Sequence, residues 1–293
     1  MAETQAPPRL EGRIRLPDGR SLACAQYGEL EGPPVIYFHG TPGSRLEHPP
    51  AIGTGTAGRV RLIVPDRPGY GLSDFHPGRR LLDWPLDVAR LADALGLERF
   101  AVVGVSGGGP HAAACAYALS DRLTGAALIS SLAPVDRPGG LEHLSPWVRA
   151  AFRLGRWAPW SLRPLIWLMS NPRRDPERFF LANTERLCPS DRRLLTRPEV
   201  RRMLAEDFRE AGRQGVRAYA QDVTLFSRPW GFALQAITMP VSVWHGECDT
   251  ILPPRMGRYL AETIPRARVR FVPDGGHFLA LNYLDGIVES LDL

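Results

Sequence analysis

Residues 100–119 have the sequence FAVVGVSGGGPHAAACAYAL. The apolar run at the start predicts a buried strand, and the alanine-rich run from Ala112 predicts a helix. Between them lies Gly104-Val-Ser-Gly-Gly108, a G-x-S-x-G pattern in which a sharp turn lifts the serine hydroxyl clear of a sheet. The glycines two residues before and after Ser106 let neighbouring backbone pass without a Cβ clash. The strand–turn–helix context therefore indicates a nucleophile elbow at Ser106 rather than an incidental glycine-rich turn.

Short apolar runs alternate with helical patterns along most of the chain. An N-terminal hairpin turns at Pro17-Asp-Gly19, and further strands are predicted at residues 35–38, 61–64, 100–103, 123–129, 241–245 and 269–272. Helices are predicted at residues 84–95, 254–264 and from 278 onward. Strands that alternate with helices predict an α/β fold, in which a mostly parallel central sheet is flanked by helices on both faces.

Residues 134–230 break this rhythm, because they are rich in Arg, Pro and Trp and contain no clear strand. We expect a helical cap, or lid, inserted after the sixth strand, with residues 1–133 and 231–293 forming the core. Five of the seven tryptophans lie in this insertion: Trp147, Trp157, Trp160, Trp167 and Trp230. They are expected to line an apolar pocket or to hold short helices against the core.

The charge composition limits the partners of this 293-residue chain. Its net charge is +5, and all 36 basic residues are arginines, so Schiff-base and phosphate-loop lysines are excluded. Residues 134–230 contain 18 arginines and 11 acidic residues, but the acids are interleaved, which favours solvated helix faces. We expect a small-molecule substrate, no nucleic-acid partner, no membrane partner, and a monomer or homodimer.

Cysteine spacing and hydropathy suggest a compartment. The four cysteines show no C-x-x-C spacing, which argues against disulfides or a zinc site. No apolar run approaches the roughly 20 residues of a membrane helix, and the first residues lack the apolar core of a signal peptide. We therefore expect a cytoplasmic protein with no metal and no cofactor.

A serine hydroxyl needs a histidine base, which a carboxylate orients. In this architecture the chain order is serine, acid, histidine. Asp249 follows the strand at 241–245, and His277 follows the last strand after two glycines. With Ser106, both lie at the carboxyl ends of predicted strands, where open parallel sheets build their sites. Competing candidates remain, namely Glu247 and Asp136 for the acid and His39, His111 and His245 for the base.

The developing oxyanion also needs hydrogen-bond donors. The backbone N–H of Gly107, at the start of the elbow helix, is one candidate. Thr41 N–H is the second, in the loop His39-Gly-Thr-Pro-Gly43 after an early strand. The Thr41 hydroxyl could add a contact, and we expect His39 and Gly40 beside the substrate.

Taken together, these motifs resemble the α/β-hydrolase superfamily, of the capped serine hydrolase type. The matching stretches are HGTPGS (39–44), DRPGYGLSD (66–74), GVSGG (104–108), HGECD (245–249) and GGH (275–277). The resemblance implies an α/β-hydrolase fold, and it implies that Tyr70 faces the cavity. Ser106 differs from the aspartate of branches that open epoxides or carbon–halogen bonds. The sequences His39-Gly-Thr and Pro65-Asp-Arg depart from the imino-peptidase branch.

The expected activity is that of a serine hydrolase. Ser106, Asp249 and His277 would form the catalytic triad, and Thr41 and Gly107 the oxyanion hole, to cleave a small to medium ester, thioester or lactone through an acyl-enzyme. Carbon–carbon bond hydrolysis or acyl transfer with the same triad is the alternative. A small-molecule-binding protein without activity is a third possibility, which a broken triad would have favoured.

Overall fold

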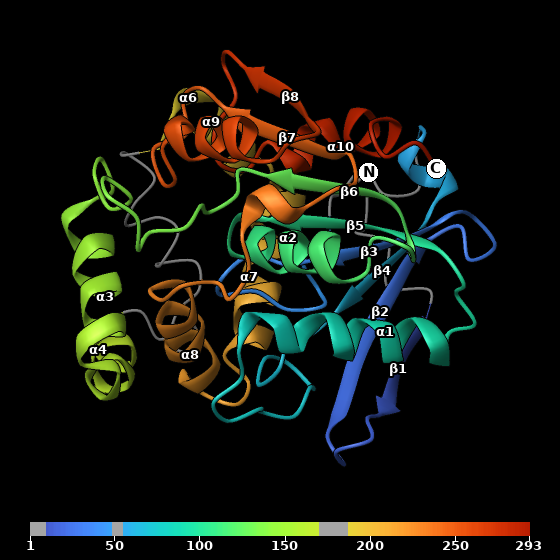
Figure 1. The fold of residues 1–293 in the computed structure, drawn as a ribbon, viewed down its shortest axis with the longest axis horizontal. Coiled ribbons are helices and arrows are strands. Elements are labelled where there is room, and N and C mark those ends of the chain that lie inside the picture. The colour runs from blue at the N-terminus through green and yellow to red at the C-terminus, as the bar shows by residue number, and fades with distance from the viewer. Residues whose placement is uncertain (1–9, 49–54, 170–186) are drawn as a thin grey trace.

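The computed structural model describes residues 10–48, 55–169 and 187–293. Eight strands form one sheet in the order β1-β2-β4-β3-β5-β6-β7-β8 (Figure 1). Strands β1, β2 and β4 pair antiparallel, and all pairs from β4 to β8 are parallel, as predicted. The strands are β1 (Leu10–Arg15), β2 (Ser21–Gly28), β3 (Pro34–Phe38), β4 (Arg61–Pro65), β5 (Phe100–Val105), β6 (Leu123–Ile129), β7 (Val241–Gly246) and β8 (Ala267–Val272).

Helices cover both faces of the sheet and bury a separate apolar cluster on each. Helices α1 (Trp84–Ala94), α2 (Gly109–Ala118) and α9 (Pro254–Thr263) contribute to one cluster, and α10 (Ala280–Glu289) contributes to the other. Strand β5 shows how one sequence serves both clusters. Phe100 and Val102 belong to the first cluster, whereas Ala101 and Val103 belong to the second. Because both faces are covered, the strand is apolar at every position instead of alternating.

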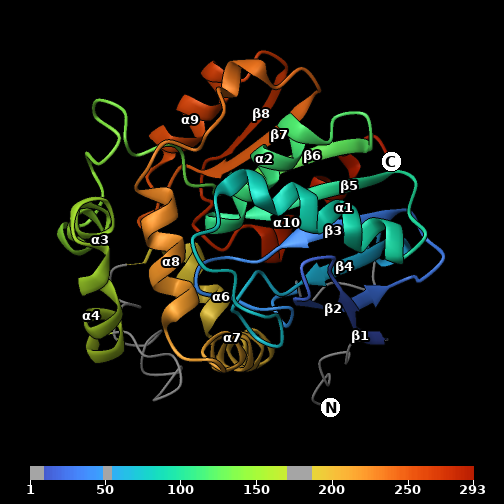
Figure 2. The ribbon, with the colours of Figure 1, turned by 60° about the horizontal axis from the view of Figure 1, so that its bottom comes forward.

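The segment between β6 and β7, here named the helical insertion, contains no strand within its described residues. Its helices are α3 (Pro146–Trp157), α4 (Leu162–Met169), α6 (Pro189–Leu195), α7 (Pro198–Ala211) and α8 (Arg217–Phe226). Both views place α3 and α4 at one side of the molecule, on the outer side of α8 (Figures 1 and 2). The insertion begins after the sixth strand, as the sequence indicated. Its separation from the core as a cap domain of residues 134–230 stays a prediction.

The tryptophans of the insertion do not share one role. Trp230 is buried and packs in the main apolar cluster, as expected for a side chain that holds helices to the core. Trp147, Trp157 and Trp160 are instead exposed, and Trp167 is half-exposed. Trp157 lines a separate cavity of about 340 Å³, which is one of the two expected roles, whereas the exposure of Trp147 and Trp160 does not fit a role in packing.

Candidate active site

The elbow begins where β5 ends. Ser106 adopts a left-handed backbone conformation with φ of 54°, which is strained for any residue with a Cβ. Its flanking glycines are sterically required. A Cβ on Gly104 would lie 2.7 Å from the Cβ of Ala112, and one on Gly108 would lie 2.1 Å from the carbonyl oxygen of Phe38. The turn therefore presents the Ser106 side chain at the carboxyl end of β5, as the sequence pattern indicated.

The three predicted catalytic residues meet at this edge of the sheet. The His277 Nε2 atom lies 3.0 Å from Ser106 Oγ, and its Nδ1 atom lies 2.8 Å from Asp249 Oδ2. A carboxylate only accepts hydrogen bonds, so the ring proton belongs on Nδ1. Nε2 then keeps a lone pair that can accept the proton of the Ser106 hydroxyl.

Asp249 is fixed by further donors. Its Oδ1 atom accepts the backbone N–H groups of Ile251 and Leu252, both at 2.9 Å. The His245 Nε2 atom lies 3.4 Å from Oδ2 and donates to the Leu252 carbonyl at 2.9 Å. The carboxylate is thereby held in one orientation toward the His277 ring.

Electrostatics favour an ion pair between Asp249 and the ring. Burial alone would raise the pKa of Asp249, but the charge of His277 and hydrogen bonds from His245 and His277 lower it. Burial alone would lower the pKa of His277, yet the Asp249 carboxylate outweighs that effect and raises it. The arrangement therefore stabilises a protonated His277, the form that a base takes after accepting a proton.

None of the competing acids and bases forms a hydrogen bond with Ser106 Oγ among the described residues. Glu247 is partly exposed and pairs with Arg258 at 3.1 Å, and Asp136 is exposed. The ring of His111 is buried between the Gly107 carbonyl and Arg79. Among the candidate bases only His277 contacts Ser106 Oγ within the described residues, whereas His245 contacts Asp249 Oδ2 at 3.4 Å.

Thr41 and Gly107, the predicted oxyanion-hole residues, lie side by side. A Cβ on Gly107 would lie 2.3 Å from Thr41 Oγ1. The Thr41 hydroxyl accepts from Arg67 Nη2 at 2.7 Å and donates to Asp222 at 3.1 Å. The expectation that this hydroxyl adds a contact to the oxyanion is thus corrected, because its hydrogen bonds go to other side chains. The backbone N–H groups remain the candidate donors.

A cavity of about 350 Å³ opens over Ser106 and His277. Its described wall is mostly apolar and includes Val148, Leu187, Leu204, Phe208, Ile251, Phe278 and Leu281. Gly40 and Thr41 line it, as predicted for residues beside the substrate. His39 and Tyr70 do not. The His39 Nε2 atom accepts the Arg67 backbone N–H, and the Tyr70 hydroxyl donates to Asp222 at 2.9 Å. His39 thus links the loop of residues 39–43, here named the oxyanion loop for its predicted role, to Arg67. Neither His39 nor Tyr70 lines the cavity, which corrects their predicted contact with substrate.

Glu47 lines the cavity and was missed by the sequence analysis. Its Oε2 atom accepts the Gly40 N–H at 2.7 Å, and its Oε1 atom accepts the Tyr37 hydroxyl at 3.0 Å. Burial raises the pKa of this carboxyl. Glu47 is the one carboxyl, and no arginine is found, among the described residues of the cavity wall. A lone glutamate in a loop carries no local pattern that would have predicted this position.

Three buried carboxyl groups of the helical insertion, also missed, hold the loops of the site. The first is Asp191 of α6, whose oxygens accept the backbone N–H groups of His277 at 2.8 Å and Phe278 at 3.1 Å. A Cβ on Gly276 would lie 2.2 Å from Asp191 Oδ2, so this close approach requires glycine there. The insertion thus clamps the backbone of the histidine loop.

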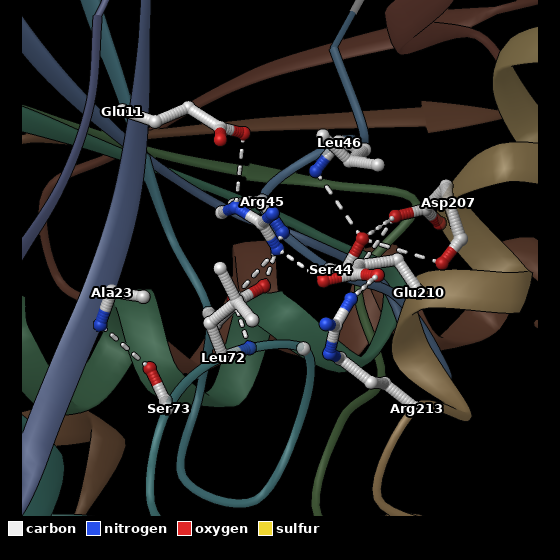
Figure 3. Close-up of polar contacts among 12 residues, drawn as sticks. Glu11, Ala23, Ser44, Arg45, Leu46, Leu72, Ser73, Asp207, Glu210 and Arg213 are labelled. Carbon is white, nitrogen blue, oxygen red and sulfur yellow. Dashed lines mark hydrogen bonds and ion pairs between the residues drawn. The ribbon is translucent and has the colours of Figure 1, made fainter.

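The second is Asp207 of α7. Its Oδ1 atom accepts both the N–H and the hydroxyl of Ser44, each at 2.7 Å (Figure 3). Its Oδ2 atom is buried without a hydrogen-bond partner among the described residues. Next to it, Arg45 pairs with Asp66 at 3.2 Å and with Glu210 of α7 at 2.6 Å. Helix α7 is therefore fastened to the segment that follows the oxyanion loop.

The third is Asp222 of α8. It lies fully buried between Arg67, at 2.9 Å from Nη2, and Arg79, whose Nη2 it also contacts. Burial would raise the pKa of Asp222, but the charges of Arg79 and Arg67 lower it. Arg67 also donates to the His39 and Gly40 carbonyls. Helix α8 thus fixes the oxyanion loop through an ion-pair cluster.

Two further properties of the described residues bear on other classes of protein. They contain no group of three or more histidine, cysteine, aspartate or glutamate side chains that could hold a metal ion. Among the helices in the same ranges, none is both long enough and apolar enough to cross a membrane.

Comparison with known proteins defines the class. A family model described as "alpha/beta hydrolase fold" matches residues 33–282. Because this match covers most of the chain, the chain belongs to the α/β hydrolase fold family.

Individual relatives are distant. The chain is 24% identical over 284 residues to 2-hydroxymuconate semialdehyde hydrolase of Pseudomonas putida, which covers 94% of this chain and 92% of that protein. It is 32% identical over 126 residues to non-heme chloroperoxidase of Streptomyces lividans, but that match spans only 42% of this chain and 46% of the relative. A solved thermophilic esterase from Thermogutta terrifontis is 28% identical, with a TM-score of 0.66 and 96% coverage of each chain. These relatives support a hydrolase without defining its substrate.

Proposed function

We propose that the protein is a serine hydrolase that cleaves a carboxylic ester, thioester or lactone. The observation that carries this proposal is the His277 ring, which bridges Ser106 Oγ at 3.0 Å and Asp249 Oδ2 at 2.8 Å beneath the cavity. Such a bridge is what an activated serine nucleophile requires.

In the proposed mechanism Ser106 Oγ attacks the substrate carbonyl while its proton passes to His277 Nε2. The negative charge on the carbonyl oxygen is stabilised by the N–H groups of Thr41 and Gly107. His277 returns the proton to the leaving group, and an acyl-enzyme remains on Ser106. Water then attacks this ester while His277 accepts one of its protons. When the bond between the acyl carbon and Ser106 Oγ breaks, His277 returns that proton to Oγ, and the acid product leaves.

The first test is hydrolysis of p-nitrophenyl esters of graded acyl length, with Ser106→Ala run in parallel. We expect turnover by the native chain with an optimum at small to medium acyl groups, because the cavity holds about 350 Å³. Ser106→Ala and His277→Ala should each lower kcat by on the order of 10³-fold or more. Equal turnover by Ser106→Ala would contradict the proposal.

The cavity also supports an uncharged acyl group. Its described wall is apolar apart from a few hydroxyls, His277 and Glu47, and it offers no arginine to a carboxylate. We therefore expect p-nitrophenyl butanoate to exceed the p-nitrophenyl hemisuccinate in kcat/KM by at least about 100-fold, since burying an unpaired charge is costly. Comparable rates for the two esters would show that an acidic acyl group is accommodated.

Hydrolysis of a carbon–carbon bond is the second candidate. It is favoured by the match along nearly the whole chain to a protein named 2-hydroxymuconate semialdehyde hydrolase. The same serine triad can serve either reaction, so identification of the products from a ring-fission substrate would separate the two. Cleavage of such a substrate at a rate that exceeds all esters would favour this candidate.

A further inference from the structure

Helices α3 and α4 and the short turn between them, Pro159–Ser161, carry several exposed aromatic side chains. Trp147, Trp157 and Trp160 expose 66%, 78% and 79% of their surface, and Leu168 exposes 69%. Outside the insertion, Trp84 and Trp244 are buried. Single exposed apolar residues are ordinary, but several large ones on one pair of adjacent helices indicate a contact surface.

The same helices carry a one-sided charge. Residues 145–169 contain four arginines, at 149, 153, 156 and 163, and no acidic residue. Arg149, Arg153 and Arg156 are spaced for neighbouring turns of α3, so they lie along one side of that helix. None of the four forms an ion pair with a carboxylate of the described residues, in contrast to Arg67 and Arg79. Their charge is available to an external partner.

We propose that these exposed tryptophans and arginines of α3, α4 and the turn between them, here named the Trp/Arg surface, dock on an anionic lipid bilayer. Tryptophan rings prefer the boundary between headgroups and acyl chains, and arginines are attracted to anionic headgroups. The docking is peripheral, since helices of 12 and 8 residues are too short to span a bilayer. A second copy of the chain is a poor occupant, because a two-fold contact would bring the same arginines against each other.

This surface lies next to the candidate active site. Ser145 and Val148, at the start of α3, line the cavity, whereas Trp147 and Trp157 are exposed to solvent. Figures 1 and 2 show α3 and α4 at one side of the molecule, with the edge strand β1 toward the other side. The charge composition alone favours solvated helix faces, whereas the exposed tryptophans on the same segment indicate a contact surface.

Co-sedimentation of the full chain with vesicles tests the proposal. We expect binding to an equal mixture of phosphatidylglycerol and phosphatidylcholine, weakened by salt, and binding at least about 10-fold weaker to phosphatidylcholine alone. Trp157→Ser/Trp160→Ser and Arg153→Glu/Arg156→Glu should each weaken binding to the anionic vesicles by on the order of 10-fold. Circular dichroism and Tm would verify that the variants remain folded.

The matched control is Arg13→Glu/Arg15→Glu, which makes the same change in net charge at two exposed positions on β1. It should bind nearly as the native chain does. If this control lost vesicle binding equally, the effect of the arginine variant would be due to net charge alone, and the proposal would be overturned. Absence of vesicle binding by the native chain would also overturn it. Preference for single-stranded DNA, or dimerisation through this surface, would also overturn it. Ser106→Ala should bind vesicles normally, so failure here is distinguishable from failure of the hydrolase mechanism.

Discussion

Two buried aspartates of neighbouring helices hold the same part of the active site in opposite ways. Asp222 of α8 and Asp207 of α7 are both fully inaccessible to solvent, and both reach the segment after β3, at Thr41 and at Ser44. Asp222 faces two arginines, and its pKa is lowered. Asp207 forms no ion pair with an arginine of the described residues; burial and the nearby Glu47 raise its pKa well above the usual range. Although the two carboxyl groups are equally buried, Asp222 favours its charged form and Asp207 favours its protonated form, because their neighbouring groups differ.

The largest loss of stability is expected from Asp222→Asn. It leaves Arg67 and Arg79 buried without their carboxylate, and breaking a buried pair in this way costs about 3–5 kcal/mol of unfolding free energy. Chemical denaturation measures this value.

Asp93→Asn is the matched control, because Asp93 also lies between two arginines, Arg90 and Arg122, but is exposed. It should cost less than about 1 kcal/mol. Similar losses for the two variants would show that burial does not distinguish the clusters.

Asp191→Asn is expected to act on catalysis. Asp191 holds the backbone of His277 and helps to raise the pKa of that ring by its charge. We expect kcat to fall about 10-fold, as for a small misplacement of a catalytic group. The acid limb of the kcat/KM profile should move to lower pH, since His277 must be unprotonated to act as a base.

The pH profile distinguishes this positioning role from a purely structural one. If Asp191→Asn only disordered the loop that contains His277, kcat would fall but the acid limb of the kcat/KM profile would not move. Asp191→Ala, which removes both acceptor atoms, should lower kcat further while producing a similar shift of the limb. An unchanged limb in both variants would contradict the role given to the Asp191 charge.

The smallest change in stability is expected from Asp207→Asn. The raised pKa means that folded Asp207 retains a proton which the unfolded chain, with a pKa of about 3.9, has released. Stability of the native chain should therefore fall as pH rises from about 3.9 through the folded pKa. Near pH 4 the stability of Asp207→Asn should differ from that of the native chain by less than about 1 kcal/mol. Above pH 4 the stability of the variant should decline less with rising pH than that of the native chain. Thermal unfolding across this range measures both. A variant that is destabilised as strongly as Asp222→Asn would show that Asp207 acts as a paired charge.

The elbow and the meeting of the three candidate catalytic residues could be predicted because each residue lies in a local pattern of strand, turn and glycine. Ser106, Asp249 and His277 follow three strands of one sheet, so predicting the strands was enough to bring them together. Asp222 and Arg67 lie 155 positions apart, and Asp191 and His277 lie 86 apart. Such pairs depend on how the insertion packs, for which the local sequence contains no signal. The same holds for Tyr70, whose motif was recognised but whose hydroxyl turns toward Asp222.

The proposed hydrolase activity depends most directly on Ser106 as the nucleophile. Intact-mass measurement after treatment with a fluorophosphonate, on the native chain and on Ser106→Ala, tests this at the residue itself. We predict one covalent adduct, located on Ser106 by peptide mapping, together with loss of ester hydrolysis, and no adduct on the variant. An unlabelled native chain that still hydrolyses esters, or a variant that is labelled equally, would contradict the proposed mechanism.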